Sequence, residues 1–188
     1  MELQMKSPQS LSYFTYAILP ILLLPSLSHA SSIDVNFHDD TTRIIYATYT
    51  ARDVVSDGGA LIINQQDDST EQVFHLGISK VSKNVRFGLR GIYTSPGDND
   101  VLAIGLGLNA KFGLSRKTSF SVNGYYAPEL TSIMDATGYS ELGLRLSFNI
   151  TKPLDLYLGY RNLKVEIDGR DKSVELDDDF HLGLKFYF

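Results

Sequence analysis

Charged residues alternate with apolar residues in several stretches of the chain, and this spacing is the main chemical signal in the sequence. An interior face predicted from the alternation collects six basic and two acidic side chains: Arg86, Arg90, Lys111, Arg145, Arg161 and Lys185, with Glu141 and Asp155. A charge in a low-dielectric interior must be paired or hydrated. Two interpretations stay open: a narrow water-filled path that favours anions, or a plug in which Arg–Glu pairs tie opposite strands together.

Acidic clusters form a second set of candidate residues, and all of them fall at the predicted external end of the molecule. They are Asp39-Asp40, Asp67-Asp68, Asp98 with Asp100, and Asp177 to Asp179. Clustered carboxylates suit Ca²⁺ or Mg²⁺, but the 95–100 segment lacks the ligand spacing of an EF-hand loop. We therefore expect a solvated acidic rim and predict no metal site.

Histidines are the remaining candidates for catalysis. His38, His75 and His181 lie near acidic residues, and we expect each at the rim of the fold, where a strand begins or ends. A Ser–His–acid site needs its three side chains together, and no serine is placed beside these histidines by the sequence. Gly105-Leu106-Gly107 lacks the third glycine and the strand-to-helix context of a nucleotide fingerprint. We predict no enzyme, no catalytic residue and no cofactor.

Length and composition bound the fold that holds these residues. The 188 residues suit one domain. The net charge of −5, from 22 acidic and 17 basic residues, argues against a nucleic-acid partner. Cysteine is absent, which excludes disulfides and thiolate chemistry.

The N-terminal segment is typical of a secretory signal peptide. Its apolar run, AILPILLLPSL over residues 17–27, is interrupted by two prolines and is shorter than the about 20 residues a spanning helix needs. Lys6 precedes the run, and Ser28-His29-Ala30 resembles a cleavage site. We expect residues 1–30 to be removed on export through the periplasm, and residues 31–188 to form the folded domain.

The rest of the chain alternates between apolar and polar residues over unusually long stretches. Leu102 to Phe112 is the clearest case, and Phe180 to Phe188 closes the chain in the same way. Period two indicates strands. Strands of about 10–12 residues suit a tilted transmembrane strand better than a soluble sandwich, where about 5–6 is usual. We predict an all-β transmembrane antiparallel β-barrel of ten strands, at about 32–38, 43–53, 58–65, 72–81, 84–94, 101–112, 118–127, 138–150, 154–166 and 175–188. Eight strands is the alternative, if the first two ranges form no separate hairpin.

Connection lengths and aromatic positions also favour an outer-membrane barrel. Short connections near 82–84, 113–117 and 151–153 alternate with longer ones near 66–70, 95–100, 127–138 and 168–172, as short periplasmic turns and longer external loops do. Aromatic residues near the strand ends predict a girdle: Tyr93, Phe112, Phe120, Tyr126, Tyr139, Phe148, Tyr160, Phe186 and Phe188.

The C-terminus carries a pattern that we interpret as a signal for barrel-assembly machinery. Apolar residues stand at every second position up to the terminal Phe188. We assign the signal to Phe186 and Phe188. No phenylalanine is assigned at position 184, because that residue is Leu184.

Several segments are similar to one known family. Five stretches resemble the YfaZ family of Gram-negative outer-membrane proteins: SSIDVNF, VLAIGLGLNAKFG, SVNGYYAPEL, LDLYLGYRNLKVEIDGRD and FHLGLKFYF. The resemblance covers most of the chain after residue 30, is best from Val101 onward and is looser between Thr42 and Gln66. It implies a small integral outer-membrane barrel, and it supplies neither an established activity nor catalytic residues.

Function follows less directly than location. We expect a narrow pore or passive barrel that aids envelope permeability or integrity. Its partners would be the lipid bilayer, lipopolysaccharide, the assembly machinery and, for a pore, small ions or solutes. The alternatives are a platform that binds or adheres through external loops such as Ala127 to Gly138, and an enzyme at the barrel rim that acts on lipid or peptide.

Overall fold

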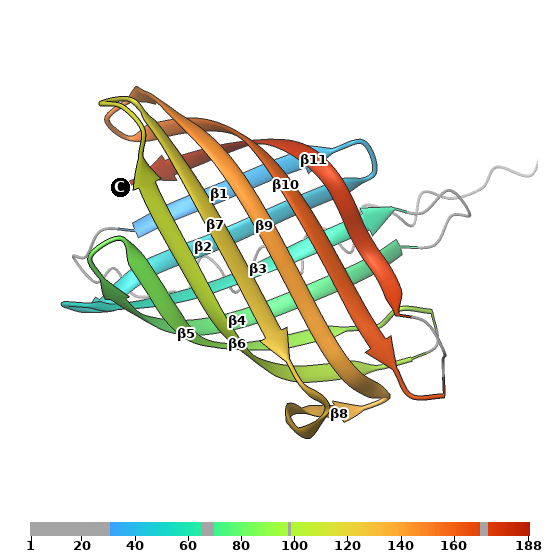
Figure 1. The fold of residues 1–188 in the computed structure, drawn as a ribbon. Coiled ribbons are helices and arrows are strands. Elements are labelled where there is room, and N and C mark those ends of the chain that lie inside the picture. Colours follow the sequence, from blue (N-terminus) through green and yellow to red (C-terminus); the bar gives the residue numbers. More distant parts are fainter. Residues whose placement is uncertain (1–30, 65–69, 98, 170–172) are drawn as a thin grey trace, which may run out of the picture.

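Ten antiparallel strands form a closed barrel in the computed structural model, which describes residues 31–64, 70–97, 99–169 and 173–188 (Figure 1). The barrel strands are β1 (Ser31–His38), β2 (Thr41–Ala51), β3 (Val54–Asn64), β4 (Thr70–Ser82), β5 (Val85–Thr94), β6 (Val101–Gly113), β7 (Thr118–Ala127), β9 (Ala136–Thr151), β10 (Leu154–Ile167) and β11 (Val174–Tyr187). Ten strands rather than eight are therefore confirmed. No helix in these described ranges is long and apolar enough to cross a membrane.

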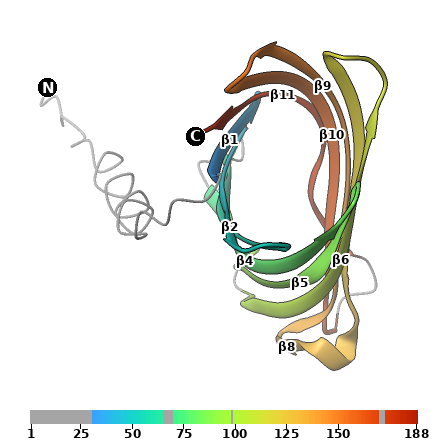
Figure 2. The same ribbon diagram turned by 90° about the vertical axis from the view of Figure 1, so that its left-hand side faces the viewer.

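Closure joins the two ends of the described chain. β1 pairs with β11, and β5 pairs with β6, so every barrel strand has two hydrogen-bonded neighbours. The Ser31 amide donates to the Phe188 carbonyl at 2.8 Å, and the Phe188 amide donates to the Ser31 carbonyl at 2.9 Å. Figure 2 shows the strands as a ring with β11 beside β1. Closure satisfies backbone groups that would otherwise face hydrocarbon without a partner.

The predicted alternation separates an outer face from an inner one. On β6 the side chain of Leu106 is 67% exposed, whereas Ala103 is fully buried. On β11 Leu182 is 60% exposed, whereas His181 is buried. Exposed large apolar side chains therefore surround the barrel, where the bilayer would be, and the polar side chains and the remaining apolar ones face its interior.

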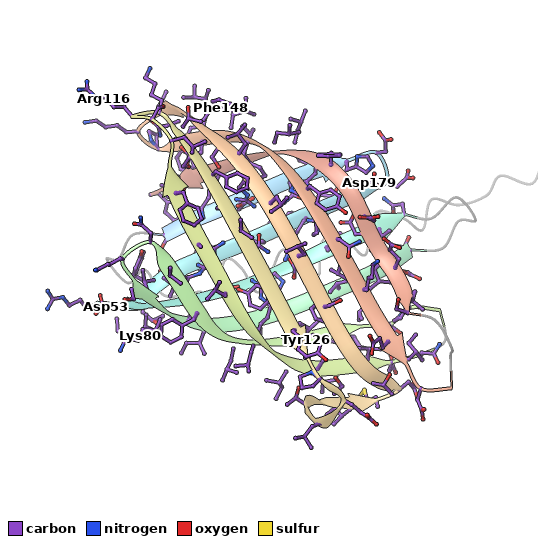
Figure 3. The ribbon with its side chains drawn as sticks, viewed as in Figure 1. Asp53, Lys80, Arg116, Tyr126, Phe148 and Asp179 are labelled. Carbon is purple, nitrogen blue, oxygen red and sulfur yellow. The ribbon has the colours of Figure 1, made fainter. Side chains whose placement is uncertain are left out.

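The two ends of the barrel differ. We call the end that holds Ser31 and Phe188 the terminal end; the turns after β2, β4, β6 and β9 are also there. The connections after β1, β3, β5, β7 and β10 form the loop end. In Figure 3 Asp53, Lys80 and Arg116 lie at the terminal end, and Asp179 lies at the opposite one.

Strand boundaries differ from the sequence prediction mainly at β3. This strand begins at Val54, four residues earlier than predicted, because residues 54–57 continue the ladder with β2 and β4 instead of connecting two strands. Two short elements in the connection from β7 to β9 were also not predicted. They are a 3₁₀ turn, η2 (Glu129–Thr131), and β8 (Ser132–Met134), which pairs with the start of β6.

The aromatic girdle is present, with one correction. Six of the predicted residues are exposed large side chains close to strand ends: Tyr93, Phe112, Tyr126, Phe148, Phe186 and Phe188. Phe120 and Tyr160, also predicted, are half-buried. Tyr139 is wrongly assigned, because it is only 2% exposed and its hydroxyl donates to the Glu141 carboxylate at 3.0 Å. It follows Gly138, close to the start of β9, and points into the barrel.

The end of β11 presents alternate residues to the outside of the barrel. Leu184, Phe186 and Phe188 are all exposed there. Leu184 is opposite Val35 of β1 and Leu156 of β10, so it belongs to an aliphatic row across three strands. The outward-facing residues at positions 184, 186 and 188 are thus one leucine followed by two phenylalanines. The aromatic part of the predicted assembly signal is limited to Phe186 and Phe188.

Candidate functional site

The interior is filled at the loop end by a cluster of apolar side chains, which we call the apolar cap. It consists of Leu61, Ile63, Val73, Ile92, Val101, Ala103, Tyr125, Ala127, Ala136, Tyr139, Leu163, Val165, Ile167 and Leu176. Ile92, Val101 and Val165 have no exposed surface. The cap draws on eight strands, from β3 to β11. A barrel of about eight strands is just wide enough for side chains to fill, and here apolar residues fill the loop end.

A buried group of ion pairs, the ionic layer, adjoins the cap. It contains Arg43, Asp57, Arg90 and Glu141. Glu141 accepts from Arg43 at 2.7 Å and from Arg90 at 3.2 Å, and Arg90 also donates to Asp57 at 3.1 Å. The Arg90 guanidinium lies 3.6 Å from the centroid of the Tyr125 ring. These contacts join β2, β3, β5 and β9 across the interior, as the plug interpretation requires.

A second group of polar contacts crosses the interior between β1, β9 and β10. Arg145 donates to Asp34 at 2.5 Å and stacks 3.7 Å from the centroid of the Tyr157 ring. The Tyr157 hydroxyl also donates to Asp34, and it accepts from Asn36 at 3.0 Å. Arginine suits such sites because its planar fork can bond carboxylates and stack on rings at once.

Arg161 forms a third buried pair, with Asp177 on the neighbouring strand β11. Its guanidinium also donates to the Asn36 side chain at 3.2 Å. Asp177 is only 6% exposed, so assigning it to the acidic rim is wrong. Asp39, Asp40, Asp100, Asp178 and Asp179 are exposed, whereas Asp67, Asp68 and Asp98 lie outside the described residues.

A polar cavity of about 510 Å³ occupies the rest of the interior and reaches the terminal end. Seven of the eight interior charges singled out from the sequence line it: Arg86, Arg90, Lys111, Glu141, Arg145, Asp155 and Lys185. Asp155 accepts from Asn149 at 2.9 Å and from Tyr187 at 3.0 Å. The eighth, Arg161, is buried deeper with Asp177. Seven basic residues line the cavity, against the four acidic residues Asp34, Asp57, Glu141 and Asp155.

Sequence reasoning missed four charged residues of the interior. Asp34 lies between Ile33 and Val35, so the alternation could have placed it inside. Arg43 begins the predicted second strand, where the face is hard to assign. Asp57 precedes two glycines and looks like a turn residue, and Asp177 belongs to an acidic run that looks like a loop. The sequence around Asp57 and Asp177 therefore gave no indication that these two side chains are buried.

Two of the three histidines are inside the barrel, which corrects the prediction that all are at the rim. His75 is 6% exposed and lies 3.5 Å from the Asp57 carboxylate. His181 is also 6% exposed, and its ring covers Gly159 on the adjacent strand. Only His38 is at the loop end, 3.2 Å from Asp179.

Glycines on the inner face make room for aromatic rings. A Cβ at Gly107 would overlap the Tyr125 ring, and a Cβ at Gly183 would overlap the Tyr157 ring. These are the two rings on which Arg90 and Arg145 stack. The glycines therefore relieve crowding and let each tyrosine lie against the neighbouring strand, under its arginine.

Metal-ligating clusters are not found in the described ranges, where no three His, Asp or Glu side chains are grouped suitably.

Solved outer-membrane barrels resemble this fold. The outer membrane protease OmpT from Escherichia coli has a TM-score of 0.51 and 8% identity, over 85% of this chain and 93% of that one. The NanC porin has a TM-score of 0.42 and 12% identity, over 85% and 94% of the two chains. The outer membrane channel DcaP of Acinetobacter baumannii has a TM-score of 0.39 and 13% identity; 84% of this chain matches 62% of that longer one. The likeness to the OmpT structure, at 8% identity, indicates the fold and not the activity.

Sequence comparison is more specific. No curated protein sequence matches the chain. A family model described as "YfaZ precursor" matches residues 12–188, nearly the whole chain. The resemblance found in the sequence motifs and the barrel fold agree with this match. The chain therefore belongs to the YfaZ family.

Proposed function

We propose that this chain is an integral outer-membrane protein whose barrel is closed to diffusion and serves the integrity of the envelope. The observation that carries the proposal is the double closure of the interior. The apolar cap fills the loop end, and the ionic layer crosses the barrel next to it. Short turns and chain ends usually face the periplasm in such barrels, so the cavity would open to the periplasm.

Closure in two layers opposes ion passage for two separate reasons. An ion needs water or polar groups along its path, and the side chains of Ile92, Val101 and Val165 offer neither. In the ionic layer the Glu141 carboxylate is already held by two guanidinium groups. Opening a path there would break pairs whose charges are buried, which costs several kcal/mol. This arrangement supports a passive barrel over a narrow pore.

Planar-bilayer conductance of the purified, refolded protein tests the proposal. We expect no current steps from the native protein. A triple variant combines Ile92→Ala, Leu163→Ala and Glu141→Ala. The first two changes remove side-chain volume from the apolar cap, and the third removes the carboxylate from the ionic layer. We expect this variant to conduct ions. The matched control, Leu89→Ala with Leu106→Ala and Leu158→Ala, trims three lipid-facing side chains and should stay closed. Regular current steps from the native protein would overturn the proposal in favour of a pore.

A further inference from the structure

The cavity at the terminal end has one wall that carries hydrogen-bond donors and no carboxylate. Its lining residues from β5, β6 and β7 include six polar side chains, which we call the donor wall: Arg86, Asn109, Lys111, Ser119, Ser121 and Asn123. The cavity-lining carboxylates come from β1, β3, β9 and β10 instead. The wall formed by β5, β6 and β7 thus carries positive charge and neutral donors without a carboxylate.

The strand register brings these donors close together. Arg86 is directly opposite Asn109, which is opposite Asn123 on β7. Lys111 is opposite Ser121, one inward-facing position further along β6 and β7. Directly opposed residues have Cβ atoms about 4.5–5.5 Å apart, and diagonal ones about 7–8 Å. The long side chains of Arg86 and Lys111 can therefore reach one bound group.

The cations of the donor wall, together with Lys185 of β11, have no carboxylate partner among the described residues. Asp34, Asp57 and Glu141 are each bonded to an arginine, and Asp155 accepts from Asn149 and Tyr187. Arg86, Lys111 and Lys185 form no ion pair within 4 Å with any residue in the described ranges. Lys83 also lines the cavity and has no such pair in the described ranges, so four positive charges face a cavity whose carboxylates already accept side-chain hydrogen bonds.

The inner end of the cavity adds two unused donors. Arg43 and Arg90 both line it, are more than nine-tenths buried, and each has an Nε atom without a hydrogen-bond partner among the described residues. A buried donor without a partner carries a free-energy cost that a bound acceptor or water can remove. Surplus cations and unsatisfied donors around one enclosed volume indicate an acceptor-rich, negatively charged ligand.

We propose that the cavity at the terminal end binds a small hydrophilic oxyanion, held by Arg86 and Lys111 and oriented by the amides and hydroxyls of the donor wall. Phosphate and carboxylate groups share the required chemistry, because both accept charge-assisted hydrogen bonds from arginine and lysine. A volume of about 510 Å³ lies in the range of small-molecule sites. The ligand enters and leaves from the periplasmic side, since the apolar cap closes the other end. The site goes beyond the closed-barrel proposal, and only the route of entry rests on it.

Isothermal titration calorimetry on the folded barrel in neutral detergent tests this site. The probes are glucose 6-phosphate, glucuronate and uncharged glucose, which share a sugar ring and differ in charged group. We expect saturable binding of at least one anionic probe, with a Kd below about 1 mM, and none of glucose. Affinity should fall as sodium chloride is raised, because salt screens the charges. The stronger anionic probe identifies the preferred oxyanion.

Paired substitutions place the binding in the cavity. Arg86→Gln with Lys111→Gln should weaken binding of the anionic probe at least about tenfold, since two charge-assisted bonds are lost. The matched control is Arg116→Gln with Lys117→Gln, which removes the same charge from the exposed turn between β6 and β7 outside the cavity and should bind as the native protein does. A heat-dependent gel shift checks that both variants are folded.

Three outcomes would overturn the site. They are no binding of either anionic probe up to about 10 mM, equal binding of glucose, and equal losses in the cavity and turn variants, which would indicate attraction by net charge alone. Conductance of the native protein would instead overturn the closed-barrel proposal, and would leave the calorimetric result standing.

Discussion

Glu141 forms more side-chain hydrogen bonds than any other residue of the ionic layer. Its carboxylate accepts from Arg43, Arg90 and Tyr139, and it is 4% exposed. Taking away one partner of a buried ion pair typically costs about 3–5 kcal/mol, because the remaining charge is stranded. The layer therefore depends on this single carboxylate.

Replacing Glu141 by Gln keeps the shape and removes the charge. We expect the free energy of unfolding to fall by about 3 kcal/mol, measured by urea titration of the protein in lipid vesicles. Glu129→Gln, in the exposed 3₁₀ turn of the loop end, removes the same charge and should change stability by less than about 0.5 kcal/mol. Similar losses from both variants would argue against a special role for the buried pairs.

Gly107 is the second residue whose size is dictated by its neighbours. Gly107→Val would force the Tyr125 ring away from β6 and so disturb the stacking of Arg90. Overpacking of this kind costs about 1–3 kcal/mol, which the same urea titration would measure. Gly91→Val is the matched control, because the nearest atom to its Cβ, the Leu76 carbonyl oxygen, is 3.9 Å away. Equal stability of the two variants would contradict the close-packing explanation.

At the level of strands, alternation predicted most of the architecture. The β6 and β11 ladders, for example, begin and end within a residue or two of the predicted ranges. The prediction was wrong where a local signal competed with the long-range one. Asp57-Gly58-Gly59 has the composition of a turn, yet Asp57 is held in β3 by Arg90 of β5. Asp177 similarly looks like a loop residue until Arg161 is seen beside it. Partners on other strands decide both cases, and a single sequence does not reveal them.

The last strand allows the predicted assembly signal to be tested. Phe186 and Phe188 lie on the outer face of the barrel, with ring centroids 6.0 Å apart, so they contribute little to the interior. Phe186→Ala with Phe188→Ala should leave refolding into detergent almost unchanged. In cells the same variant should assemble at least several-fold less, measured as the fraction showing the heat-dependent gel shift. The control Phe87→Ala with Phe112→Ala, also two exposed aromatics, should assemble normally. Equal assembly of all three proteins would exclude a signal in these residues.

Across the whole molecule, side chains in the barrel change character from one end to the other. The loop end is acidic outside and apolar inside, the middle is ion-paired, and the terminal end holds a polar cavity with a basic lining. The alternation could predict which residues point inward, but not how far along the axis each would lie. The depth of a residue along the barrel axis depends on strand tilt and stagger. This depth explains why the Arg161 side chain is buried while the Arg86 side chain lines the cavity. The proposal of a plug rather than a path therefore rests on the structure and not on the alternation.

Closure through Ser31 and Phe188 has a topological consequence. Because the first and last described residues exchange two backbone hydrogen bonds, a short linker between them would make the polypeptide a continuous loop without moving a strand. The ring would then have no natural starting point, and a cut in any turn at the same end would yield a circular permutant with every strand neighbour preserved. In this barrel the order in which the strands are synthesised could therefore be changed without changing which strands are neighbours.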